Sequence, residues 1–149
     1  MQNPGIKNLG DAALSAINAA TGGAIITSAS DRQGVSQSYL DRLEGMNSAT
    51  VAVNFNWGSG GTSLDVYVET TLDQGTTWVQ VAHAHFTTAS AQKLFNLSAE
   101  TDQVDAFTPA ALANDKGQWG IFGDRWRARI ITVGTYGGNT SLSVRMSAR

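Results

Sequence analysis

TLDQGTTW, residues 71–78, decides the fold, because it has the composition of a hairpin turn and lies between two alternating apolar runs. Upstream, Leu64, Val66 and Val68 alternate with polar residues over 63–70, and a second alternating run follows over 77–86. Within the turn, Asp73 can accept hydrogen bonds from the backbone amides that follow it, and Gly75 can supply a positive φ. The stretch therefore predicts two antiparallel strands joined by a tight turn.

The same stretch resembles the Asp-box, a Ser/Thr-x-Asp-x-Gly-x-Thr-Trp hairpin that recurs in sialidase propellers and occurs singly in many unrelated β proteins. Its key positions are occupied here by Thr71, Asp73, Gly75, Thr77 and Trp78. In those families the motif is a folding device that lies away from the active site. A propeller would repeat it about every 40 residues, whereas this chain holds one copy in 149 residues. The resemblance therefore implies a hairpin and not a sialidase.

Composition and charge narrow the class of protein. The chain has 149 residues, of which 15% are charged and none is cysteine. This length suits one domain, and the lack of cysteine excludes disulfides and thiolate metal sites. A net charge of −2 and a pI near 5.5 argue against nucleic-acid binding. No stretch approaches the roughly 20 apolar residues of a membrane helix, and the N-terminus lacks a secretory apolar run, so we expect neither nucleic acid nor membrane as a partner.

Residues 1–23 have a different pattern and are predicted to form a partly helical N-terminal arm. Apolar residues recur there at helical spacing, at Leu9, Ala13, Ala16, Ile17 and Ala20. A stripe made mostly of alanine buries little area, so such a helix would have to dock on something. Two placements remain open: a frayed terminus lying on its own domain, or an arm ordered against a neighbouring subunit.

Residues 24–149 have the pattern of a single β domain. Strands are predicted over 24–29, 36–43, 49–57, 63–70, 77–86, 92–98, 125–133 and 140–147. Alternation assigns inward faces to Val51, Val53, Phe55 and Trp57, and to Leu142, Val144 and Met146. Short strands with Gly-rich turns indicate an all-β, antiparallel β-sandwich, and eight strands suit a jelly roll.

One connection, residues 99–123, is too long for a simple turn. Loops longer than about 12–15 residues in a compact domain are usually functional or disordered. This one is apolar, with residues that include Phe107, Trp119, Ile121 and Phe122. Two interpretations remain open: the loop folds back to close an open end of the sandwich, or its apolar residues form a contact patch for another subunit.

His83 and His85 are the strongest candidates for chemistry, since two histidines one residue apart on a strand point the same way and can share a metal ion. The pair resembles the metal-binding dipeptide of jelly-roll cupins, which also have a carboxylate four or five residues later and a third histidine. Here Thr-Thr-Ala-Ser occupies 87–90, and the chain has two histidines in all. Because a working site needs three protein ligands, we predict no metal and no cofactor.

The run RWRARI, residues 125–130, alternates between arginine and apolar residues. Arg125, Arg127 and Arg129 therefore share one strand face, and the apolar residues share the other. The arginines either pair with acids on a neighbouring strand or present a basic ladder to an acidic partner.

The sequence lacks the motifs that would indicate a hydrolase, a nucleotide-binding enzyme or a glycosidase. There is no GxSxG elbow for a serine hydrolase and no glycine-rich phosphate loop leading into a helix. Asp65 and Glu69 lie along one strand and do not face each other across a cleft, as the carboxylates of a glycosidase would. We therefore predict a protein that is not an enzyme.

Residues 45–149, and above all TVAVNFNWGSGGTSLDVYVETTLDQGTTWVQVA, resemble small virion proteins of tailed bacteriophages. Among these, the resemblance favours a capsid decoration or cement protein, made in the host cytoplasm and located on the capsid surface. It implies binding to the major capsid protein and to itself, as a dimer or trimer. The contact residues would then be Leu9, Ile17, Phe107, Trp119, Ile121, Phe122, Arg125, Arg127 and Arg129.

Two other functions remain open. A carbohydrate-binding module or a fibre or tail-associated receptor-binding domain would stack sugars on Trp57, Trp119 or Tyr136, which requires exposed aromatic rings. Alternation instead predicts that Trp57, Trp78 and Trp126 point inward. A head-tail connector or tail-completion protein is the third possibility.

Overall fold

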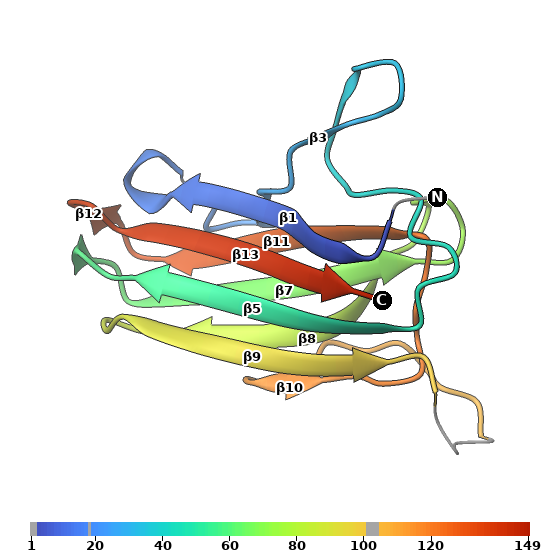
Figure 1. Ribbon diagram of the computed structural model, residues 1–149. Coiled ribbons are helices and arrows are strands. Elements are labelled where there is room, and N and C mark those ends of the chain that lie inside the picture. The colour runs from blue at the N-terminus through green and yellow to red at the C-terminus, as the bar shows by residue number, and fades with distance from the viewer. Residues whose placement is uncertain (1–2, 18, 101–104) are drawn as a thin grey trace.

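The computed structural model describes residues 3–17, 19–100 and 105–149, and strands dominate them. One antiparallel sheet has the order β1-β13-β5-β9, formed by Gly5–Ala13, Ser141–Ala148, Ser48–Asn56 and Ala91–Ser98. The second has the order β10-β8-β7-β11-β2, formed by Lys116–Gly117, Val79–Phe86, Ser63–Thr71, Arg125–Val133 and Ala24–Ile25. The two sheets lie one over the other (Figure 1).

Four shorter elements complete the fold. β12 (Tyr136–Gly137) pairs with β6 (Ser59–Gly60), and β3 (Ala29–Ser30) pairs with β4 (Ser36–Gln37) in a hairpin that projects from the two layers (Figure 1). A 3-10 turn, η1 (Leu14–Ala16), follows β1. No helix in the described part of the chain is long and apolar enough to cross a membrane.

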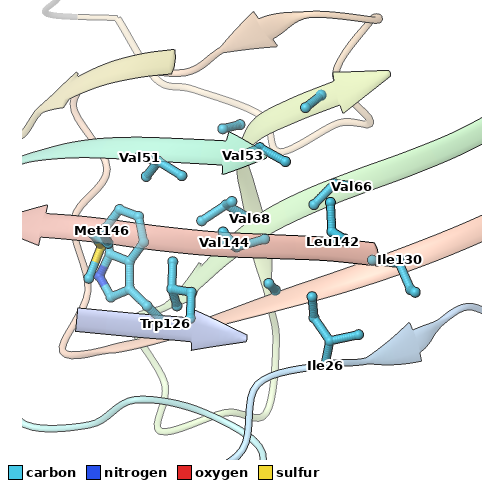
Figure 2. Close-up of a cluster of buried hydrophobic side chains, with 14 of the residues drawn as sticks. Ile26, Val51, Val53, Val66, Val68, Trp126, Ile130, Leu142, Val144 and Met146 are labelled. Carbon is cyan, nitrogen blue, oxygen red and sulfur yellow. The ribbon is translucent and has the colours of Figure 1, made fainter. Parts of the chain in front are cut away.

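The core lies between the facing surfaces of the two sheets. Figure 2 shows side chains from both layers meeting there, including Val51, Val66, Trp126 and Val144, all of which have no exposed area. The inward faces predicted for 49–57 and 140–147 are confirmed at Val51, Val53, Phe55, Leu142, Val144 and Met146. Strict alternation of apolar and polar residues thus fixes which face of each long strand is buried.

Six predicted strands are confirmed, each to within two residues, as β5, β7, β8, β9, β11 and β13. The other two predictions are largely wrong. Over 24–29, β2 contains only Ala24 and Ile25. Over 36–43, only Ser36 and Gln37 are in a strand, and Leu40 then makes an isolated bridge to Trp126. Both segments lie outside the long ladders and pair with β11 over only one or two residues.

The predicted N-terminal helix is wrong, because residues 5–13 form strand β1, which pairs along its length with β13. A bulge between Asn8 and Gly10 interrupts the register, so the apolar residues do not alternate strictly. The Thr27 hydroxyl donates to the Leu9 carbonyl, and a Cβ on Gly10 would lie 2.7 Å from the Ile26 carbonyl oxygen. β1 is therefore built into the sheet and packed closely against the next segment.

The turn at residues 71–78 has the hydrogen bonds that its sequence predicts. Asp73 accepts from the Thr77 amide at 2.8 Å, from the Thr77 hydroxyl at 2.7 Å and from the Thr71 hydroxyl at 2.7 Å. Gly75 has φ 97°, and its carbonyl accepts from the indole of Trp78. The hydrogen bonds from Thr77 and Thr71 lower the pKa of the Asp73 carboxyl to about 2.

Asp73→Asn is expected to destabilise the protein at neutral pH and to lose that effect in acid. Since the folded-state pKa of Asp73 is about 2 and its ordinary value is 3.8, the carboxylate stabilises the fold above about pH 4. This contribution is lost as the pH falls through about 2. Urea unfolding of both proteins at pH 7 and pH 2 checks this, and an equal difference in unfolding free energy at both pH values would contradict it.

Candidate functional site

The outer face of β11 carries the three arginines that the sequence placed together. Arg125, Arg127 and Arg129 are each about one-fifth to one-quarter exposed, with side-chain exposures of 24%, 21% and 19%. The alternate residues Trp126, Ala128 and Ile130 have no exposed area. The predicted division of this strand into a polar and an apolar face is confirmed.

Glu69 lies opposite these arginines on β7 and binds two of them. Its side chain is 4% exposed, one carboxylate oxygen accepts from Arg127 Nε at 2.7 Å, and the other accepts from Arg129 Nε at 3.0 Å. The register pairs Arg127 directly with Glu69. Of the two interpretations of the arginines, the structure therefore contains the pairing with an acid on the neighbouring strand, with one carboxylate between two guanidinium groups.

Aromatic rings lie against the same guanidinium groups. Arg127 is 4.1 Å from the ring centre of Trp78, Arg129 is 4.8 Å from that of Tyr67, and Arg125 is 5.0 Å from that of Tyr39. These distances are those of cation–π contacts. The prediction that Trp78 points inward is therefore wrong. Burial, with the nearby carboxylate of Asp65, raises the pKa of Tyr67, which keeps its hydroxyl neutral.

The described part of the long connection, residues 105–123, packs along its own domain. The Leu112 amide donates to the side chain of Gln80, and β10 pairs with β8. A shallow groove lies between this segment and the sheet, lined by residues that include Glu69, Trp78, Pro109 and Arg129. Phe107 is half-buried in this segment. The segment around Pro109 thus covers part of the surface that carries Arg125, Arg127 and Arg129, which we call the arginine face.

Further along, the connection crosses from one sheet to the other and leaves one large aromatic ring exposed. The Gln118 amide donates to Val81 of β8, and the Gly120 amide donates to Ser98 of β9. Between them, Trp119 is 61% exposed, and its indole nitrogen donates to the Asn96 carbonyl at 3.0 Å. Leu94, also 61% exposed, lies two residues before Asn96 on the outer face of β9. We call Leu94, Asn96 and Trp119 the β9 patch.

The remaining predicted contact residues are less accessible. Ile121 and Phe122 pack against the core, and the ring of Phe122 lies 4.6 Å from that of Trp126. Ile17 is half-buried against the core, and Leu9 has no exposed area. Leu9 therefore offers no surface to a partner in this conformation. Of the nine residues predicted to make contacts, Trp119 is the one that the structure places openly on the surface.

His83 and His85 lie on the outer face of the same sheet, at the end away from Arg125, and a residue from β7 joins them. Asp65 pairs with His85 across the β7–β8 ladder, and its carboxylate oxygen contacts both imidazole rings. Sequence reasoning found the histidine pair but placed Asp65 along its own strand with Glu69, without linking it to the histidines. The three side chains could hold a metal ion, because their donor atoms lie within 4.8 Å of one another.

A bulge explains why this third residue was missed. β7 and β8 pair Val68 with Ala82 but Glu69 with Gln80, so Val81 is an extra residue on β8. Counting back from the hairpin without this bulge would place His83 opposite Val66, on the buried face. The register shift moves both histidines to the outer face, beside Asp65 and Tyr67.

No family model, curated protein or solved structure matches this chain. The fold, the arginine face, the β9 patch and the Asp65–His83–His85 cluster are therefore the features from which a function can be inferred.

Proposed function

We propose that this protein is a structural virion protein that decorates a phage capsid by binding its outer lattice as a homo-oligomer. Its fold, in this proposal, is an eight-stranded jelly roll made of β1, β2, β5, β7, β8, β9, β11 and β13. Supporting this, β1 pairs with β13, β2 with β11, β5 with β9 and β7 with β8. Among these eight strands the first therefore pairs with the eighth, the second with the seventh, the third with the sixth and the fourth with the fifth, which is the topology of a long hairpin folded over on itself. Viral capsid and lectin domains use jelly rolls.

The observation that carries the proposal is the exposure of Trp119. Tryptophan is enriched among residues that dominate binding energy, and 61% exposure is unusual for so large a ring in a protein without a partner. Its bond to the Asn96 carbonyl holds the indole in one orientation, which lowers the entropy lost on binding. Leu94 adds apolar area, and Gln92 and Asn54 add hydrogen-bonding groups on the same sheet face. An apolar anchor within polar surroundings is the usual anatomy of a protein interface.

The protein would stabilise the capsid by mass action. A protein that binds only the expanded shell stabilises it by the free energy of binding. Many weak contacts on a repeating lattice then act together, because an oligomer held at one site has a high effective concentration at the next. On the arginine face, the guanidinium groups of Arg127 and Arg129 share the single carboxylate of Glu69, and this excess of positive charge suits an acidic capsid surface.

Trp119→Ala is expected to weaken binding to undecorated heads by about 30-fold, equivalent to roughly 2 kcal/mol. Purified protein would be mixed with expanded heads that lack it, and binding would be followed by co-sedimentation and by the heat resistance of the shells. Leu72→Ala is a matched control, since Leu72 is 73% exposed but lies in the hairpin turn after β7. Failure of the unaltered protein both to sediment with the shells and to protect them from heat would refute the proposal. Sedimentation with connectors or tails instead would favour the head-tail or tail-completion role.

A carbohydrate-binding role is the second candidate, and Trp119 again is the observation that favours it. Of the three aromatic residues considered as sugar platforms, Tyr136 is 2% exposed, and Trp57 is half-buried with its indole donating to the Gly60 carbonyl. Of these three residues, Trp119 alone is largely exposed. A glycan panel read by tryptophan fluorescence discriminates the two roles: a response that Trp119→Ala abolishes supports sugar binding, and no response from any glycan excludes it.

A further inference from the structure

The Asp65–His83–His85 cluster is built from two neighbouring strands and converges on one point. Asp65 Oδ1 lies 2.8 Å from His83 Nε2 and 2.7 Å from His85 Nδ1. The side chains of His83, Asp65 and His85 are 4%, 18% and 27% exposed. The cluster is therefore enclosed on the His83 side and open to solvent on the His85 side.

Hydrogen bonding around His83 turns the lone pair of one ring nitrogen toward the Asp65 carboxylate. His83 Nδ1 lies 2.8 Å from the Leu112 carbonyl oxygen, which can only accept, so Nδ1 carries a hydrogen. In a neutral imidazole the other nitrogen, Nε2, then has a lone pair, and here that lone pair faces a carboxylate oxygen. Two acceptors at this distance repel unless a positive charge lies between them, and a proton or a metal ion can supply it.

The surroundings of His83 are those of a metal-bound histidine. Metal-bound histidines usually donate their second ring nitrogen to a carbonyl or carboxylate, as His83 does to Leu112. The ring of Tyr67 stacks on His83 with centres 4.4 Å apart. Asp115 accepts from the His85 amide and pairs with Lys93, so this lysine is neutralised next to the cluster. The His83 ring and the β8 backbone at His85 are thus held before any ion binds.

We propose that Asp65, His83 and His85 bind a divalent first-row transition metal ion, with a fourth position open to solvent. Two imidazoles and one carboxylate suit zinc, copper, nickel or iron and do not suit magnesium or calcium, which prefer oxygen ligands. Ligands around a tetrahedral zinc ion at about 2.0–2.1 Å are roughly 3.3 Å from one another. The present separations of 2.7 and 2.8 Å would therefore open by about half an ångström, a shift that side-chain rotation can supply. The ion would tie β7 to β8 and, through His83, to the segment at Leu112.

The test is titration of the untagged, chelator-treated protein with Zn²⁺ by calorimetry, and with Co²⁺ by visible absorption, which reports tetrahedral nitrogen and oxygen ligands. We expect one ion per chain and a rise in melting temperature with Zn²⁺. His85→Ala and Asp65→Asn should each weaken binding at least about 100-fold, since even outer partners of metal ligands change affinity 10- to 100-fold. Both positions are partly exposed, so these variants should fold, whereas loss of the buried His83 could unfold the sheet.

Asp11→Asn is the matched control, because it removes an exposed carboxylate from β1 on the other sheet. Its affinity for Zn²⁺ should equal that of the unaltered protein. No binding at about 1 mM ion, several weak sites, or equal binding by His85→Ala would each overturn the proposal. Since the test needs no capsid, its result is independent of the decoration role.

Discussion

Trp126→Ala is expected to lower the free energy of unfolding by about 4 kcal/mol, a large part of the roughly 5–15 kcal/mol available to a domain. Trp126 is the largest side chain without exposed area, and it fills the core between the sheets near Met146 (Figure 2). Its indole nitrogen donates to the Gly123 carbonyl at 2.9 Å. Removal would leave both a cavity and an unsatisfied buried acceptor.

Urea unfolding followed by far-ultraviolet circular dichroism measures this loss, and Trp119→Ala is the matched control. The same substitution at an exposed indole should cost less than about 1 kcal/mol. Trp126→Phe keeps most of the volume and should fall between the two, which keeps the prediction testable if Trp126→Ala does not fold. Equal unfolding free energies for the two alanine variants would contradict this assignment of the core.

Glu69→Gln is expected to cost about 3 kcal/mol, although it removes no volume. The carboxylate is nearly buried and bridges Arg127 and Arg129, so a neutral amide leaves two guanidinium groups close together without a counter-charge. Breaking one side of a buried ion pair is far more costly than losing an exposed one. The repulsion should also loosen the contacts of both arginines with Trp78 and Tyr67.

Thermal unfolding at low and high salt checks this prediction. The melting temperature of Glu69→Gln should fall by roughly 6–12 °C, on the scale of about 2–4 °C per kcal/mol for a domain of this size. Salt should recover part of the loss by screening the two arginines. Glu100→Gln, which changes an exposed carboxylate, is the control and should be nearly neutral. A melting temperature unchanged by Glu69→Gln would show that the arginines do not depend on this acid.

The long strands could be predicted because each has one fully apolar face. Val51, Val53 and Phe55 in β5 and Leu142, Val144 and Met146 in β13 alternate without interruption, and the structure buries all six. The hairpin between β7 and β8 could be predicted because its hydrogen bonds are local, from Thr71 and Thr77 to Asp73. Patterns that depend on nearest neighbours in the chain are therefore visible in the sequence.

β1 could not be predicted because its conformation is decided by a strand at the other end of the chain. Its alanines also fit a helix, and the bulge after Asn8 removes the alternation that marks a strand. Pairing with β13 overrides the local preference, as tertiary contacts often do.

The candidate metal site was hidden for a related reason. His83 and His85 were visible as a pair, but Asp65 joins them only through the register of β7 with β8, and a bulge at Val81 shifts that register by one residue. The sequence named Trp119 as a contact residue but could not single it out from Phe107, Ile121 and Phe122, since the connection that carries them has no periodic pattern. Sites formed across strands depend on registers that single-sequence patterns do not specify.

The place of β13 in its sheet has a consequence for how the protein is made. β13 lies between β1 and β5, so β1 has no strand partner until residues 141–148 exist. A chain emerging from the ribosome would carry β1 unpaired while residues 14–140 are made, with an open edge on β5 as well. Such a nascent chain would need to avoid pairing with neighbouring chains until β13 has been made. In this sheet β1 must therefore wait for β13, which follows it in the chain by more than 120 residues.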